Sequence, residues 1–195
     1  QEALPERIWS KRYLLHPTVL MISFMLFVLY LNEGAMLDWS SVFLVDERGV
    51  SLEQAGYGYA AFAIMMTSMR FLGDRIVLAM GRRRVIVLGT MIICLGFTLA
   101  ALIDHAIFTI ASFALIGIGS SNVIPQLVSY VAKVKEVPMS ISVTIVNCLG
   151  FTGVLLGPAV IGFLAHLITL HLTFVVLGVF TLSVTALSLR YLSQS

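Results

Sequence analysis

Six long apolar runs, separated by short polar connections, make up most of this 195-residue sequence. An α-helix needs about 20 apolar residues to cross the ~30 Å hydrocarbon core of a bilayer, and each run is about that long. The sequence therefore predicts an all-α integral membrane protein with six transmembrane helices. We expect these helices at residues 17–45, 55–72, 85–103, 106–132, 138–166 and 170–192.

Charged residues are scarce, which separates this chain from soluble proteins. They make up 11% of the sequence, against about a quarter in a typical soluble domain. The basic residues lie in short connections and not on one soluble face, so we predict no nucleic-acid partner. The sequence contains no nucleotide-binding loop, catalytic arrangement or metal-ligand spacing. We therefore predict no cofactor, no metal site and no enzymatic activity.

The positive charges occur in alternate connections, which gives the predicted helices a direction. In the other connections, Arg48 is the one lysine or arginine. Since basic loops are retained on the cytoplasmic side, both ends of the chain are expected in the cytoplasm, as in a multi-pass inner-membrane protein. The basic side carries Arg7, Lys11, Arg12, Arg75, Arg82, Arg83, Arg84, Lys133, Lys135 and Arg190.

The expected organisation is one bundle with short polar ends. Residues 1–16 form a cytoplasmic linker or interfacial segment, residues 17–192 the six-helix bundle, and residues 193–195 a cytoplasmic tail. The chain opens in this polar run without an initiator methionine. We therefore expect it to be a piece of a longer protein.

Several motifs of charged and small residues stand out against the apolar background. The first span contains Glu33-Gly-Ala-Met-Leu-Asp38-Trp39, and the second ends in Arg70-Phe-Leu-Gly73-Asp74-Arg75, followed by Gly81-Arg82-Arg83-Arg84. Later spans contain Gly117-x-Gly119, Pro125 and Gly153-x-x-x-Gly157-Pro158. Together these residues resemble the carboxy-terminal six-helix half of a major facilitator superfamily (MFS) transporter. The resemblance is nearest to poorly characterised bacterial inner-membrane members distantly related to the fucose permease group.

The resemblance implies a fold of two inverted three-helix repeats and a partner domain. That partner is the amino-terminal six-helix half of the same protein, or a second copy. In such transporters the substrate lies near the bilayer midplane between two halves that rock against each other. The family pattern places its Asp a few residues after the Gly and close to the next Gly-Arg, whereas Asp74 directly follows Gly73. The resemblance implies a gating role for Arg70, Gly73, Asp74, Arg75, Gly81, Arg82, Arg83 and Arg84.

Glu33 is the strongest candidate for binding substrate or a proton. A carboxylate at membrane depth is costly and usually faces a cavity or a partner. The alternative is a hydrated structural position near the outer interface. We expect the span to be interrupted here, since Gly34 allows a helix break of the kind found at transporter substrate sites. Arg70 fits a pair with Asp74 at i+4 or a position at the headgroups.

Other polar residues extend the candidate site. Asp38 fits substrate contact, although its neighbour Trp39 favours an anchor at the outer interface. Polar faces on spans four and five fit a water-filled path or contacts between helices equally well. The candidates for substrate or proton binding are Asn32, Glu33, Asp38, Asn122, Gln126 and Asn147.

These observations predict half of a secondary transporter. It would move a small polar solute across the bacterial inner membrane by alternating access, with proton coupling through Glu33, and its partners are the solute and the lipid bilayer. Two other functions stay open: a non-transporting sensor or assembly module on the same fold, and a half-size transporter that acts as a homodimer. Six further spans upstream in the complete reading frame would favour half of a secondary transporter, and a start codon just before Gln1 would favour the homodimer. Absence of solute flux in the reconstituted full-length protein would favour the sensor.

Overall fold

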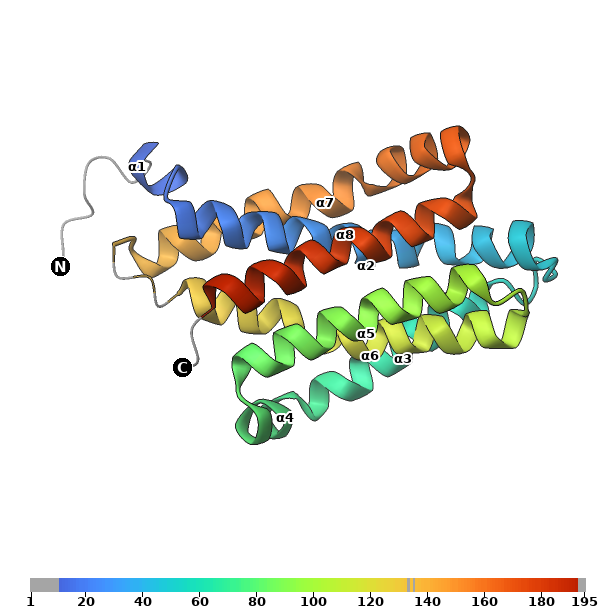
Figure 1. Ribbon diagram of the computed structural model, residues 1–195, viewed down its shortest axis with the longest axis horizontal. Helices are drawn as coiled ribbons and strands as arrows, with labels where there is room; N and C mark the ends of the chain where they lie inside the picture. The colour runs from blue at the N-terminus through green and yellow to red at the C-terminus, as the bar shows by residue number, and fades with distance from the viewer. Residues whose placement is uncertain (1–10, 133, 135, 193–195) are drawn as a thin grey trace.

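The computed structural model describes residues 11–132, 134 and 136–192. The expected tail 193–195, most of the expected linker, and Arg7, Lys133 and Lys135 lie outside the described residues. The described chain folds into a bundle of roughly antiparallel helices (Figure 1). The helices are α1 (Lys11–Leu14), α2 (Pro17–Arg48), α3 (Gly56–Phe71), α4 (Gly73–Met80), α5 (Arg82–Leu102), α6 (Ala106–Val131), α7 (Met139–Ile168) and α8 (Leu170–Tyr191).

All six predicted spans are helical within a few residues of their expected limits. Among the described residues, five helices are long and apolar enough to cross a membrane: α2, α5, α6, α7 and α8. Helix α3 has 16 residues, which corresponds to about 24 Å. It is therefore shorter than the ~30 Å hydrocarbon core of a bilayer.

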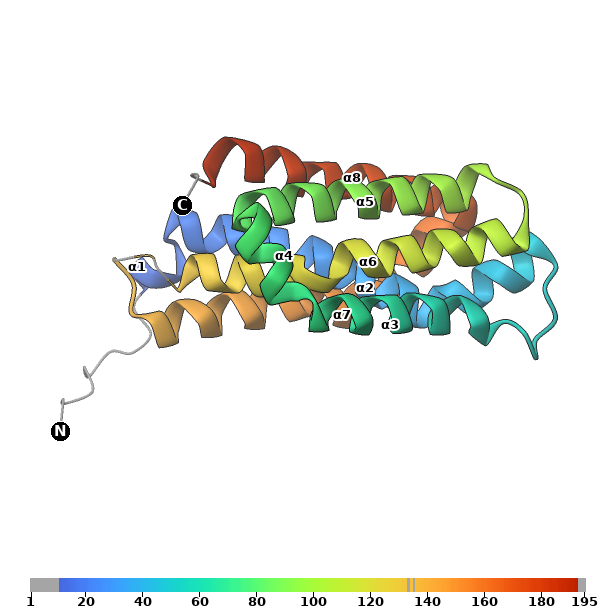
Figure 2. The same ribbon diagram turned by 90° about the horizontal axis from the view of Figure 1, so that it is seen from below.

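Two local predictions were wrong. The basic connection after the second span, where Gly73 and Gly81 suggest a tight turn, contains the eight-residue helix α4, which joins α3 to α5 (Figure 2). Gly81, with φ of +80°, separates α4 from α5. The expected interruption at Asn32–Gly34 is absent, because α2 is one continuous helix. Gly34 instead lies against the backbone of Val154 in α7.

The helices are held together by close backbone contacts and by a cluster of aromatic rings. Helix α2 packs along α7, α3 along α6, and α5 along both α6 and α8. At the α2–α7 crossing, Gly153 lies so close to the Phe27 carbonyl that no side chain fits between them. Deeper in the bundle, the rings of Phe43 and Phe174 stack at 4.4 Å. These contacts hold α7 and α8 against α2.

The two ends of the bundle carry different charges. We call the end with Arg75, Arg82, Arg83, Arg84 and Arg190 the basic end, and the opposite end, with Asp46, Glu47, Glu53 and Asp104, the acidic end. The Lys11 end of α1 and the Tyr191 end of α8 both lie at the basic end (Figure 1). The alternation of charge along the sequence thus becomes a separation of charge in space.

Candidate functional site: an ion pair at mid-depth of the bundle

Glu33 lies at the midpoint of α2. This helix has 32 residues, so Glu33 lies about 24 Å from its start at 1.5 Å per residue. Its side chain is 19% exposed. A carboxylate at this depth is costly to keep charged without a partner. The position therefore requires a compensating charge or a proton.

Arg70, in the last turn of α3, supplies the opposite charge. Its Nη2 lies 3.6 Å from Oε1 of Glu33, a distance that makes an ion pair but not a hydrogen bond. Its Nε donates to the backbone carbonyl of Ser121 in α6 at 3.2 Å. Arg70 thus joins α2, α3 and α6, and the predicted alternative of a pair with Asp74 is not what the structure shows.

The Glu33 side of this pair is incompletely satisfied. Within the described part of the chain, Oε1 of Glu33 is buried and has no hydrogen-bond partner. A carboxylate oxygen has room for two such bonds, and leaving a buried acceptor unpaired costs free energy. A polar group of a ligand would supply the missing hydrogen bond, and a proton would remove the cost of burying the charge.

Asn122 positions the end of α3 that carries Arg70. Its Nδ2 donates to the carbonyl of Met69 at 3.0 Å and to the hydroxyl of Ser121 at 3.0 Å. Gly73 packs against the same amide so closely that a Cβ there would collide with its oxygen. The asparagine therefore fixes the junction of α3 and α4 next to the arginine.

Tyr30 extends the site towards α7. It precedes Glu33 by three residues, which places the two on one face of α2. It lies within electrostatic range of both Glu33 and Arg70, and its ring contacts Phe151 of α7 at 4.7 Å. Sequence reasoning missed this residue, although its i−3 spacing from Glu33 was a usable signal.

Among the described residues, the remaining candidates form no hydrogen bond or ion pair with Glu33 or Arg70. Asn32 is buried, and its Nδ2 donates to the hydroxyl of Thr181 in α8 at 2.8 Å. Asn147 donates to Val143 of its own helix at 2.9 Å. Asp38 is exposed and Gln126 is half-buried. The structure thus brings Glu33, Arg70 and Asn122 together, whereas the amide of Asn32 serves the contact between α2 and α8.

The basic motif at the end of α3 is divided between the site and the surface. Gly73 is buried under Asn122, while Asp74 and Arg75 are exposed in the first turn of α4. A carboxylate in that turn suits the positive end of the helix dipole. Farther along, Nη2 of Arg83 donates to the carbonyl of Leu189 in α8 at 2.5 Å. The motif therefore connects α3, α4, α5 and α8 at the basic end.

Comparison with known proteins gives relatives in bacteria. Residues 8–195 match the family model described as Major Facilitator Superfamily. An uncharacterised MFS-type transporter of Yersinia pestis is 43% identical over 168 residues, which cover 86% of this chain and 44% of the relative. The membrane protein MosC of Rhizobium meliloti is 31% identical over 78% of this chain and 37% of its own length. The chain thus spans less than half the length of these relatives.

Solved structures show the same fold at low sequence identity. The MFS transporter FucP, in its outward conformation, matches all of this chain and 48% of its own with a TM-score of 0.80 at 15% identity. The peptide transporter POT, as an E310Q mutant with sulfate, matches 88% of this chain and 37% of its own, with a TM-score of 0.78 at 18% identity.

Proposed function

The chain belongs to the major facilitator superfamily of transporters, and we propose that it forms the carboxy-terminal half of a secondary transporter. In this proposal α2, α3, α5, α6, α7 and α8 each cross the bacterial inner membrane, with the basic end in the cytoplasm. The alternation of charge between the ends of the bundle supports this orientation. A partner half completes the cavity, and rocking of the two halves moves the solute.

The Glu33–Arg70 pair is the proposed coupling element. It lies at mid-depth, where alternating-access transporters bind their substrates and coupling ions. Protonation of Glu33 removes its charge and weakens its hold on Arg70. The arginine is then free to bind an anionic or polar group of the solute, or to let α2 and α3 separate. The buried Oε1 atom without a hydrogen bond is the observation that carries this proposal.

A small polar solute fits the polar groups around the pair. Glu33, Arg70 and Tyr30 combine a carboxylate, a guanidinium and a hydroxyl within one region of α2 and α3. Such groups recognise hydroxyl, amine or carboxylate substituents. Half-buried Gln126 and Asn147, on α6 and α7, add amide groups to the proposed cavity wall.

Proton transport by the full-length protein tests this function. The protein is reconstituted into vesicles that contain a pH-sensitive dye, and a panel of monosaccharides, dipeptides and small metabolites is added outside. We expect at least one solute to acidify the lumen with the wild type and not with Glu33→Gln. Glu53→Gln, which changes an exposed carboxylate at the acidic end, is the matched control and should behave as the wild type.

Two results would contradict the proposal. Solute uptake by the wild type without proton movement would show that transport is not coupled to protons. Equal acidification by the wild type and Glu33→Gln would remove the role of Glu33 while leaving transport itself in place.

A further inference from the structure

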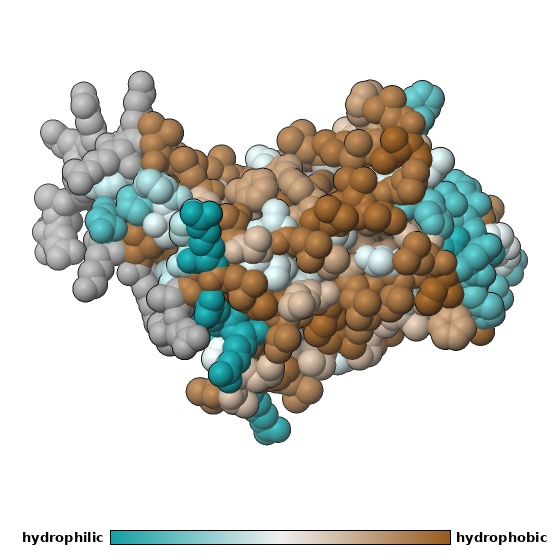
Figure 3. All heavy atoms as spheres, in the orientation of Figure 1, coloured by the Kyte–Doolittle hydropathy of each residue, from teal (hydrophilic) through white to brown (hydrophobic). Residues whose placement is uncertain are grey.

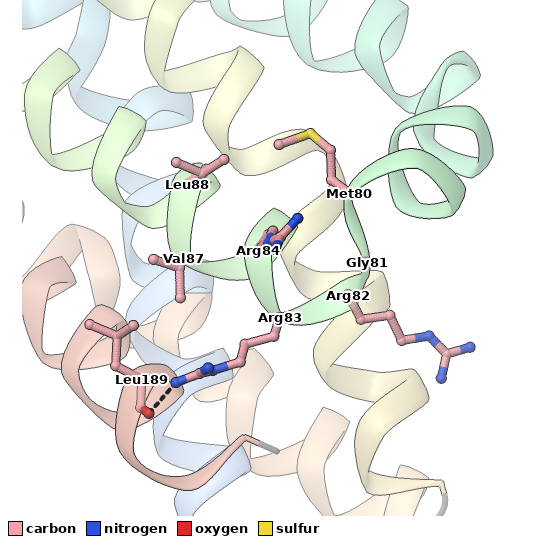
Figure 4. Close-up of a pocket in the computed structure, with 8 residues that line it drawn as sticks. All are labelled: Met80, Gly81, Arg82, Arg83, Arg84, Val87, Leu88 and Leu189. Carbon is pink, nitrogen blue, oxygen red and sulfur yellow. Dashed lines mark hydrogen bonds between the residues drawn. The ribbon is translucent and has the colours of Figure 1, made fainter. Parts of the chain in front are cut away.

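A groove at the basic end combines arginines with an apolar wall. It measures about 520 Å³ and opens between α5 and the end of α8. Figure 4 shows Arg83 reaching towards Leu189 of α8, with Met80 and Leu88 on the opposite side of the groove. The groove is lined by Met80, Gly81, Arg82, Arg83, Arg84, Val87, Leu88 and Leu189.

The arginines of this groove keep much of their capacity to bind an anion. Arg83 uses one amino group on the carbonyl of Leu189, which fixes its guanidinium in the groove. Arg84 is exposed and Arg82 is half-exposed, and within the described residues neither forms an ion pair with a carboxylate. Guanidinium groups bind phosphate oxygens through paired N–H donors. Figure 4 shows the side chain of Arg82 directed away from Arg83, so Arg83 and Arg84 are the arginines of the groove that favour a phosphate group.

A second hollow lies next to the groove. This hollow, of about 240 Å³, shares Met80 and Leu88 with the groove and runs beneath α4 towards α6. Its walls include Ile76, Ile92 and Ile118. A basic groove beside a largely apolar hollow fits a molecule with an anionic head and a hydrocarbon tail.

The groove lies at the edge of an apolar surface of the bundle. Leu88, Met91 and Leu95 on α5, and Val179, Leu182 and Leu189 on α8, are all more than 40% exposed. Figure 3 shows the middle of the bundle as largely hydrophobic, with hydrophilic atoms gathered towards its ends. In a membrane this face contacts acyl chains, and the arginines lie at the level of the headgroups.

We propose that this groove binds an anionic phospholipid, with the phosphate held by Arg83 and Arg84 and one acyl chain in the hollow beneath α4. The lipid would tie α4 to α5 and α8, and so stabilise the basic end of the bundle. The arginines of the groove are apart from the Glu33–Arg70 pair, while the hollow is also lined by Ser121 and Asn122, which lie next to Arg70. The inference does not depend on the transported solute.

Thermal unfolding of the full-length protein in detergent tests the site. Phosphatidylglycerol is titrated against phosphatidylcholine, and inorganic phosphate is tested as a free anion. We expect phosphatidylglycerol alone to raise the Tm, saturably and by roughly 3 °C or more, since a bound ligand stabilises the folded state. The rise should disappear in Arg83→Gln/Arg84→Gln and return in Arg83→Lys/Arg84→Lys.

A matched variant separates the groove from the general charge of this end. Arg75→Gln/Arg190→Gln removes the same number of charges from exposed residues that do not line the groove, and it should keep the rise in Tm. Equal loss in both double variants would overturn the proposal in favour of nonspecific attraction. An equal rise in Tm with phosphatidylcholine would show that the site does not require an anionic headgroup. An equal rise in Tm with inorganic phosphate would show that the site binds a free anion and not a lipid.

Discussion

Arg48 is a charged residue that the bundle buries almost completely. Its side chain is 2% exposed. It donates to Thr109 at 2.9 Å and to the carbonyls of Glu47 and Ala100 at 2.8 and 2.7 Å, and it pairs with Asp104 at 3.3 Å. In the sequence it is an exception to the charge alternation. The structure explains the exception, because this arginine joins the ends of α2, α5 and α6 and is not a free surface charge.

Replacing Arg48 should therefore destabilise the protein. Arg48→Ala leaves carbonyls without a donor and is expected to cost about 2–3 kcal/mol, the usual value for bonds from a charged group. Arg75→Ala, which removes an exposed arginine, should change stability by no more than about 0.5 kcal/mol. Thermal unfolding of the full-length protein measures both, and equal Tm values for the two variants would contradict this role.

At the residue scale the sequence identified one side of the ion pair and not the other. Glu33 was recognisable because a carboxylate within an apolar span is rare. Its contact with Arg70 joins residues far apart in the chain and depends on how α2 packs on α3. Local spacing favoured Asp74 as the partner of Arg70, but tertiary packing brings Glu33 closer. Asn32, adjacent to Glu33, faces α8 because neighbouring positions on a helix lie about 100° apart.

At the element scale, Gly153 makes the closest glycine contact between α2 and α7. Gly153→Ala places a methyl group against the Phe27 carbonyl, and neither backbone is free to move. We expect it to cost about 1–3 kcal/mol, as overpacking usually does. Gly157→Ala in the same helix meets the Leu31 side chain at an ordinary 3.6 Å. It should be neutral, or stabilising by up to about 1 kcal/mol, because alanine favours helix.

Thermal unfolding of the full-length protein compares the two variants directly. A Tm for Gly153→Ala equal to or above that of Gly157→Ala would show that the helices are not in close contact here. The glycine spacing in the sequence already indicated close packing. It could not show which glycine makes the contact, because that depends on how α7 is rotated against α2.

The helices themselves were predictable because each apolar run is long and has clear limits. Helix α4 was not predictable. It has only eight residues, and the glycines and arginines in and around it form a pattern that is typical of a loop. It forms because the chain must cross from α3 to α5, with Gly73 held under Asn122 at one end and Gly81 at positive φ at the other.

At the scale of the whole molecule, helix α3 decides the topology. Its 16 residues are too few to span a bilayer core of full thickness. Helix α3 would cross where the membrane is locally thinner, or where α4 adds to its length at the level of the headgroups. If α3 crosses, the acidic and basic ends lie on opposite sides, and the Glu33–Arg70 pair lies between two aqueous compartments. If it does not, the connection after α3 lies on the same side as the connection before it.

Cysteine labelling in intact cells measures this directly. Cys94 and Cys148, with any other cysteines of the full-length protein, are first replaced by serine. Glu47→Cys or Arg83→Cys is then introduced, and a membrane-impermeant maleimide is added outside. The six-span topology predicts that the probe labels Glu47→Cys in intact cells and Arg83→Cys only after the membrane is permeabilised. Equal labelling of both positions in intact cells would contradict it.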